Sequence, residues 1–194
     1  MSIRPRQLRA LALARMSDVR AAQQILSVLY AEGHRDPETM GMFARTWMDR
    51  YKNSQNRLYL ETSRDLYAEA FRLFPRDYYT GINAASKSVF LGEMERAEAL
   101  AKQVEALVGK DVVRDNYWKT ATVAEVQLIQ RNYKEAAQLY RAAVRMEPEA
   151  RGNHTSSQDQ ARMLMDHLGT PADERAQVDR AFAYPSGRTP QQRT

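Results

Sequence analysis

The histidines are the first residues to consider for metal or proton-transfer chemistry. There are three, His34, His154 and His167, spread along a chain of 194 residues. None pairs with another at the helical spacings H-x-x-x-H or H-E-x-x-H that hold a metal ion. The chain has no cysteine, which excludes disulfides, thiol catalysis and cysteine-ligated zinc. We therefore expect no metal and no cofactor, and we interpret the histidines as solvated loop or helix-end residues.

Nucleophilic and phosphate-binding motifs are also missing from the sequence. No G-x-S-x-G nucleophile elbow, Walker loop or G-x-G-x-x-G turn occurs. Ser156 and Ser157 precede an apolar helical pattern, so we expect one of them to be a helix N-cap. The carboxylates are scattered among basic side chains, as around Arg96, which is typical of a solvated helix face. No catalytic residue is predicted, and we do not expect an enzyme.

The best candidates for a binding site lie on two expected helices that begin near residues 78 and 115. Each helix presents aromatic, amide, hydroxyl and charged side chains at spacings of three and four residues, which places them on one face. This mixture suits a peptide or a small polar ligand. The candidate groove residues are Tyr79, Asn83, Ser86, Lys87, Trp118, Lys119, Thr122 and Glu125.

The same helices also permit a purely structural interpretation. Apolar residues share another face of the first helix, and Trp118 together with Ala121 could belong to the core of the second. Asn83 is costly inside a helix, by up to about 0.7 kcal/mol relative to alanine. Its amide could either tie neighbouring helices together or contact a ligand. The residues of the competing core face are Tyr78, Ile82, Ala85 and Val89.

These candidates depend on helices, which the apolar spacing predicts along the whole chain. Apolar residues recur at intervals of three, four and seven, for example at Met40, Phe43, Ala44 and Trp47, and no segment alternates as a strand would. We predict helices, with ends uncertain by about 2–4 residues, at 5–15, 18–32, 37–52, 57–74, 78–91, 94–108, 115–131, 133–147, 156–168 and 172–183.

Glycine and proline mark the ends of these helices. Two pairs, Asp36-Pro37 and Thr170-Pro171, place a capping side chain before a proline at the first helical position. Four glycines directly follow a periodic segment, where a residue with a left-handed backbone ends a helix. They are Gly33, Gly92, Gly109 and Gly169.

A pattern of small and large residues recurs along the chain. In the second helix of each pair, the apolar stripe begins with a small residue. A helix-ending position follows twelve residues later. The intervals between the small residues are 41, 34 and 39 positions. Small residues let two helices approach closely, and the large residues between them fill the gap to the next hairpin. The small residues are Ala22, Ser63, Ala97 and Ala136.

This pattern resembles the tetratricopeptide repeat (TPR). The clearest match is the second-helix stretch NYKEAAQLYRAAVRMEP at 132–148, and LGEMERA at 91–97 resembles the turn between the two helices of that repeat. First helices match less well, and the longer intervals imply insertions. The resemblance implies an all-α solenoid of antiparallel helix hairpins, with about four repeats and a closing helix pair, whose first helices line a concave, partner-binding groove.

A narrower resemblance involves the segments DYYTGINAA at 77–85 and NYWKTATVAE at 116–125. Together they resemble the variant TPR domain in the TRAF-binding region of apoptosis signal-regulating kinases, and its bacterial relatives, over about residues 57–183. In bacteria such domains are often attached to effector or signalling domains and have been proposed to sense nucleotide-derived signals. No kinase, TIR, protease or nuclease domain accompanies the match here.

The positive charge of the chain is concentrated at its ends. The net charge is +5, of which residues 1–20 contribute +4 and residues from 184 onward +2. Arg4, Arg6, Arg9 and Arg20 could contact phosphates, but without interleaved aromatic residues we favour a solvated outer face over nucleic-acid binding. A mean hydropathy of −0.65 and the lack of a long apolar run argue against a membrane span. The absence of cysteine is compatible with the cytoplasm.

Taken together, the sequence predicts one helical repeat domain at 1–183 and a disordered tail at 184–194. We interpret the chain as a non-catalytic interaction and regulatory module that binds a protein or peptide segment in its groove, in signalling or bacterial defence. The alternative is a sensor that holds a nucleotide-like ligand in the same groove. Apolar surface on the terminal hairpins could also drive self-association.

Overall fold

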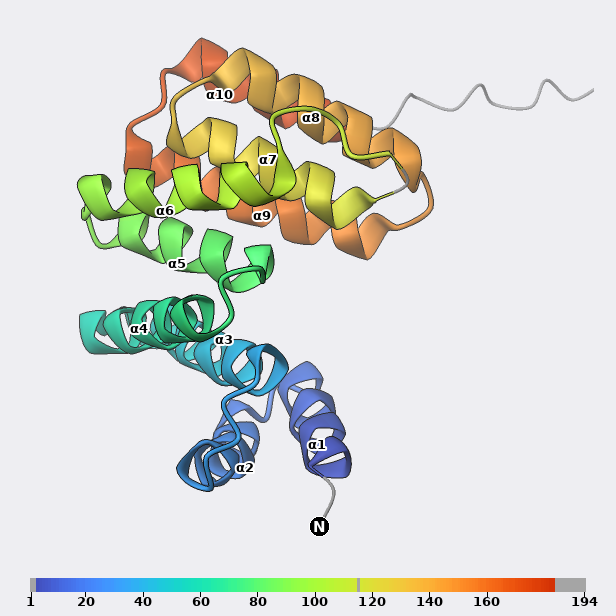
Figure 1. Ribbon diagram of the computed structural model, residues 1–194. Coiled ribbons are helices and arrows are strands. Elements are labelled where there is room, and N and C mark those ends of the chain that lie inside the picture. Colours follow the sequence, from blue (N-terminus) through green and yellow to red (C-terminus); the bar gives the residue numbers. More distant parts are fainter. Residues whose placement is uncertain (1–2, 115, 184–194) are drawn as a thin grey trace, which may run out of the picture. The chain divides into compact units, whose positions relative to one another are not determined.

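The structure, a computed structural model, describes residues 3–114 and 116–183, and these residues form helices and no strand (Figure 1). The chain divides after Lys110 into two compact units, which we call unit 1 and unit 2. The helices of unit 1 are α1 (Arg4–Arg15), α2 (Val19–Ala31), α3 (Pro37–Ser54), α4 (Arg57–Leu73), α5 (Tyr78–Phe90) and α6 (Met94–Val108). Those of unit 2 are α7 (Tyr117–Ile129), α8 (Tyr133–Met146), α9 (Arg151–Leu168), α10 (Ala172–Asp179) and the short 3-10 helix η1 (Arg180–Phe182).

Unit 1 consists of three helix hairpins, α1–α2, α3–α4 and α5–α6, and consecutive hairpins pack through α2 on α3 and α4 on α5. The first helices α1 and α3 also contact each other. The stripe of small and large residues forms the interior: Ala22, Ser63 and Ala97 are fully buried, and Tyr67 is 2% exposed. The expected role of the small residues in close helix packing is confirmed in this unit.

Unit 2 is built from the hairpin α7–α8, with α9 packed on α7 and α10 packed on α8. Ala136 and Tyr140 of α8 are fully buried, and the Tyr140 ring lies 4.9 Å from that of Phe182 in η1. The helix order therefore follows the predicted one, with one hairpin and a closing pair of helices in this unit.

The turn after each first helix uses a left-handed residue. In four of these turns the amide of the next residue donates back to a carbonyl in the last helical turn, as from Glu93 N to Ser88 O at 2.9 Å, which closes the helix end. Glycine was expected in this role, and Gly92 and Gly169 confirm it with φ of 80° and 64°. The other positions carry larger side chains at φ of 56–65°: Ser17, Gln55 and Arg131.

One predicted helix start and two predicted N-caps are wrong. Helix α9 begins at Arg151, five residues before the expected start, so Ser156 and Ser157 lie inside the helix and neither caps it. His154 and Ser157 are buried on the same face of α9, and this tertiary packing extends the helix. Thr170 does not cap α10, because Pro171 occupies the N-cap position. At the other predicted cap, Asp36 accepts a hydrogen bond from Thr39 N at 3.0 Å, as expected.

The N-terminal arginines fall into two groups. Arg4 pairs with Glu38, and Arg6 pairs with Glu32, so these two cations are used within unit 1. The hydrogen bond from Arg6 lowers the pKa of Glu32. Arg9 and Arg20 are exposed, as a solvated face requires. Among the described helices, none is long and apolar enough to cross a membrane. The predicted tail at 184–194 lies outside the described residues.

Gly81 marks the closest approach between helices in unit 1. A Cβ at this position would lie 2.7 Å from Val104 Cγ2 and 2.9 Å from Phe71 Cε2, which is too close for either contact. Val104 and Phe71 belong to α6 and α4 and are both buried. Only glycine therefore allows α5 to lie between these two helices at this distance.

We expect the substitution Gly81→Ala to lower the free energy of unfolding by about 1–2 kcal/mol, since overpacking outweighs the gain in helix propensity. The measurement is urea denaturation followed by circular dichroism. The matched control is Gly152→Ala in α9, where a Cβ would meet nothing within 4 Å and stability should be unchanged or higher. Equal effects of the two substitutions would contradict this account of the packing.

Candidate functional site

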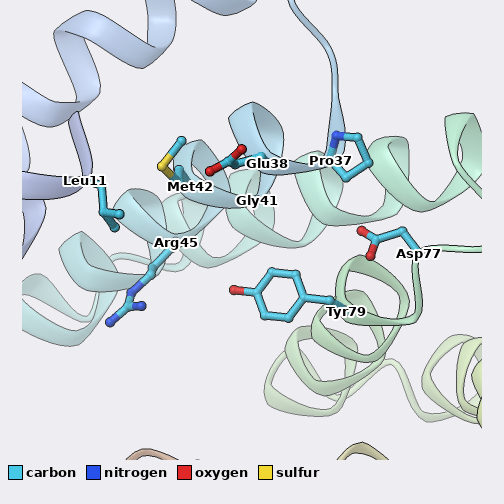
Figure 2. Close-up of a pocket in the computed structure, with 8 residues that line it drawn as sticks. All are labelled: Leu11, Pro37, Glu38, Gly41, Met42, Arg45, Asp77 and Tyr79. Atoms are coloured by element: carbon cyan, nitrogen blue, oxygen red, sulfur yellow. The ribbon is translucent and has the colours of Figure 1, made fainter. Parts of the chain in front are cut away.

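The candidate site is a cavity of about 430 Å³ in unit 1, which we call the unit 1 pocket (Figure 2). It lies among the first helices of the three hairpins, α1, α3 and α5. A cavity of this size lies within the range of about 300–1,000 Å³ that is typical of ligand pockets. Its walls are formed by Leu11, Pro37, Glu38, Gly41, Met42, Arg45, Asp77 and Tyr79.

Helix α3 contributes most of the pocket wall because one of its faces packs in the core while the opposite face lines the cavity. Met40, Phe43 and Ala44 point into the core and are buried. Glu38, Met42 and Arg45 recur at spacings of four and three residues, which places them together on the opposite side of the helix. The apolar stripe that fixes α3 in the hairpin therefore also aims these three side chains into the pocket.

Tyr79 supplies an aromatic surface in the first turn of α5. Its side chain is 46% exposed, and its ring packs edge-on against the buried ring of Tyr67 with centroids 6.1 Å apart. A Cβ on Gly41 would lie only 3.3 Å from Tyr79 Cε1, so the missing side chain makes room for the ring. Burial and the hydrogen bond with Tyr79 raise the pKa of Tyr67 well above its ordinary value of 10.0. Tyr79 is thus held in place on one side and open on the other.

The charges in the unit 1 pocket are separated. Arg45 is exposed and makes no ion pair within the described part of the chain, whereas Glu38 is compensated by Arg4. Asp77 is the N-cap residue of α5, yet its side chain caps no amide, and its Oδ2 atom is buried with no hydrogen-bond donor. Figure 2 shows the ring of Tyr79 between Arg45 and Asp77. The pocket therefore has a positive end, an aromatic centre and a negative end.

Of the candidate groove residues predicted on α5, only Tyr79 lines this pocket. Asn83 Nδ2 donates to Tyr79 O at 2.9 Å, and Asn83 Oδ1 accepts from Lys87 Nζ at 2.7 Å. The expectation that this amide ties neighbouring helices together is wrong, because both bonds stay within α5. Lys87 is 4% exposed and lies over the rings of Tyr67 and Phe90, and Ser86 is fully buried and donates to Ile82 O.

The candidate residues predicted on α7 belong to unit 2. Trp118 is 48% exposed, and its ring packs edge-on against Tyr117 at 5.1 Å. The backbone amide of Lys119 donates to Asn116 Oδ1, Thr122 is buried, and Glu125 Oε2 accepts from Gln160 at 3.4 Å. Trp118 is thus exposed, while its proposed core partner Ala121 is buried. A ligand-binding role for these four residues stays a prediction.

A buried polar cluster of unit 2 contains His154, the one histidine whose surroundings were predicted wrongly from the sequence. His154 was expected in solvent but is 2% exposed and stacks on the Tyr117 ring at 5.7 Å. Ser157 accepts a hydrogen bond from the Tyr117 hydroxyl at 2.9 Å. His34 lies in the loop after α2 and His167 in the last turn of α9, as expected. Within the described residues, no group of three or more histidines and carboxylates could hold a metal ion.

Most of the pocket residues were missed by the sequence reasoning. It examined the first helices at 78 and 115 for groove side chains but treated the stripe of α3 only as core. The same criterion, polar side chains at spacings of three and four on the face opposite the stripe, would have selected Glu38 and Arg45. Leu11 and Asp77 carry no such signal, because α1 and the turn before α5 reach the pocket only through packing of the hairpins.

Comparisons with known proteins agree with this fold. The family described as Tetratricopeptide Repeats-Sensor matches residues 2–91, just under half of the chain. No curated protein matches the sequence. A thermophilic TPR protein of Thermus thermophilus is similar over 78% of this chain and 77% of its own, with 22% identity and a TM-score of 0.58. MamA from Desulfovibrio magneticus RS-1 is similar over 92% of this chain and 95% of its own, with 10% identity and a TM-score of 0.51.

These likenesses confirm the resemblance to TPR proteins and the all-α, TPR-like fold class. Proteins of this fold are generally protein-interaction modules, typically without catalytic activity. The narrower resemblance to apoptosis signal-regulating kinases stays a prediction.

Tyr140 provides a test of the polar interior of unit 2. Its hydroxyl is buried with no hydrogen-bond partner, and burial raises its pKa well above the ordinary 10.0. The folded state favours the neutral hydroxyl. Ionisation of Tyr140 therefore leaves the free energy of unfolding unchanged below pH 10 and lowers it as the pH rises further. Tyr140→Phe should raise the free energy of unfolding by about 1 kcal/mol and weaken its decline in alkali.

The matched control for Tyr140→Phe is Tyr117→Phe, which removes a hydroxyl that donates to Ser157. It should lower the free energy of unfolding by about 1 kcal/mol. The free energies of unfolding of both variants are measured by urea denaturation at pH 7 and above pH 10. A destabilised Tyr140→Phe variant would contradict our description of this hydroxyl.

Proposed function

We propose that this chain is a non-catalytic interaction module with a regulatory role, and that it binds a segment of a partner protein on the face formed by the first helices of unit 1. The unit 1 pocket would anchor that segment. The observation that carries the proposal is the half-exposed ring of Tyr79 over a cavity lined by three first helices. The predicted residues on α7 would form a separate contact surface within unit 2.

The chemistry of the unit 1 pocket supports a peptide as its occupant. Tyrosine and arginine are over-represented among the residues that dominate binding energy at interfaces. The ring of Tyr79 is braced by Tyr67 and lies over Gly41, so little conformational entropy is lost when a partner covers it. Leu11, Met42 and Pro37 add apolar surface to the pocket wall. An apolar side chain of a partner could therefore fill the cavity while Arg45 interacts with its flank.

A non-catalytic role is supported by the arrangement of the reactive side chains. Ser157 accepts a hydrogen bond from the Tyr117 hydroxyl, and Ser86 donates its hydroxyl to Ile82 O within its own helix, so both hydroxyls take part in structural hydrogen bonds. A signalling or defence function and a cytoplasmic location remain part of the proposal. They rest on the family resemblance and on a chain without cysteine.

A second candidate function is the sensing of a small nucleotide-like ligand in the same pocket. Two observations favour it: the matching family is described as a sensor, and a cavity of about 430 Å³ can hold a drug-sized molecule. Tyr79 would stack on a base and Arg45 would contact a phosphate.

The variant Tyr79→Ala tests the peptide-binding function. Peptides selected from a displayed random library on the wild-type protein should bind the variant at least about tenfold more weakly, because a central aromatic anchor is lost. Fluorescence anisotropy gives the dissociation constants. The control is Phe74→Ala, which removes an aromatic ring that is 40% exposed but lies outside the pocket. A library that yields no binders, or binders indifferent to Tyr79, would refute the proposal.

Isothermal calorimetry with a panel of mono-, di- and cyclic nucleotides separates the second function from the first. A nucleotide sensor should give binding heat with the wild-type protein and much less with Tyr79→Ala or Arg45→Gln. The absence of heat with every nucleotide would count against sensing, while leaving the peptide-binding result unaffected.

A further inference from the structure

We propose, building on the peptide-binding function, that the unit 1 pocket selects a partner segment by the order of its charges. The segment places a carboxylate at Arg45, an apolar or aromatic side chain at Tyr79, and a cationic side chain at Asp77. The recognised chemistry is therefore an acid and a base that flank an apolar residue.

The positive end of the pocket is Arg45. Its guanidinium is exposed and forms no ion pair within the described residues, although Asp49 lies one turn further along α3. The acid nearest in sequence on the pocket wall, Glu38, is compensated by Arg4. A carboxylate from a partner can form a bidentate, charge-assisted pair with Arg45, which is stronger than a neutral hydrogen bond.

The negative end of the pocket is Asp77. Its Oδ2 atom is buried without a donor, a costly state for a carboxylate oxygen. The amides at the start of α5 do not relieve this cost, because the side chain makes no capping bond. With no hydrogen bond to hold it, the Asp77 side chain can turn toward the cavity that it lines. An ammonium or guanidinium group of a partner would then satisfy it.

The centre of the pocket determines the order of the three contacts. Tyr79 lies between Arg45 and Asp77 in Figure 2, and the apolar side chains of Leu11, Met42 and Pro37 surround the same cavity. In an extended segment, alternate side chains point the same way and lie about 7 Å apart. An acid, an apolar residue and a base, placed in this order on alternate positions of one partner segment, would then meet Arg45, Tyr79 and Asp77.

This charge order also distinguishes a peptide from a nucleotide. A nucleotide supplies a flat ring and an anion, which suit Tyr79 and Arg45, but it brings no cation for Asp77. A peptide with both charges satisfies the two ends together. A preference for a cationic side chain at the Asp77 end is therefore expected for a peptide and not for a nucleotide.

The experiment is selection of a displayed random peptide library on four proteins: wild type, Arg45→Glu, Arg45→Gln and Arg72→Glu. The last is the matched control, an exposed arginine on α4 outside the pocket. Thermal melting confirms first that each variant is folded. Wild type and Arg72→Glu should enrich the same acid–apolar–base pattern. Arg45→Gln should lose the acid preference, and Arg45→Glu should replace the acid with a base.

Affinities measured with single peptides make the outcome quantitative. Reversing the acid of an enriched peptide to lysine should weaken binding to wild type by about tenfold and restore binding to Arg45→Glu. Binders that require Tyr79 but show no charge order, or keep the same order on Arg45→Glu, would overturn this proposal while the peptide-binding function stands. If no peptide binds wild type, the proposed function itself fails.

Discussion

The left-handed residue that ends each first helix is the constraint on which the rest of the structure depends. At Gly92 the chain turns within a few residues, and the amide of Glu93 bonds back to Ser88 O. The next helix can then return antiparallel beside the first, so that a short segment closes a hairpin. The small residues of the second helices make that approach close. In the second hairpin, the fully buried Ser63 even donates its hydroxyl to the Ala44 carbonyl at 2.8 Å.

The same turns decide which helices share a face in unit 1. Because each hairpin repeats the previous one, α1, α3 and α5 all contribute to the pocket wall, while α2 and α4 pack against the following first helix. Gly41 lets the Tyr79 ring lie close to α3, since a Cβ there would be only 3.3 Å from Tyr79 Cε1. A repetitive scaffold thus acquires a distinct site through one missing side chain and one half-exposed ring.

Two other cations of unit 1, Arg64 and Lys87, are held by contacts within the protein. The largely buried guanidinium of Arg64 bonds to Glu93 and Asp65, which links α4 to the turn between α5 and α6. Lys87 donates to Asn83 within α5 and lies over the rings of Tyr67 in α4 and Phe90 in α5. Arg45 differs from these residues because its charge faces the pocket. This difference in surroundings, and not the residue type, separates a structural cation from one available to a partner.

The sequence alone determined the helices, their pairing and the repeat. Three local signals indicate them: the spacing of apolar residues, the glycines that end helices, and the small residues Ala22, Ser63, Ala97 and Ala136. Each signal depends only on residues of its own hairpin. Tertiary structure decided the rest. It extended α9 to bury His154, placed Ser17, Gln55 and Arg131 in a backbone conformation that sequence assigns to glycine, and brought Leu11, Arg45 and Asp77 together around Tyr79. These outcomes arise from contacts between residues far apart in the chain, which no local periodicity records.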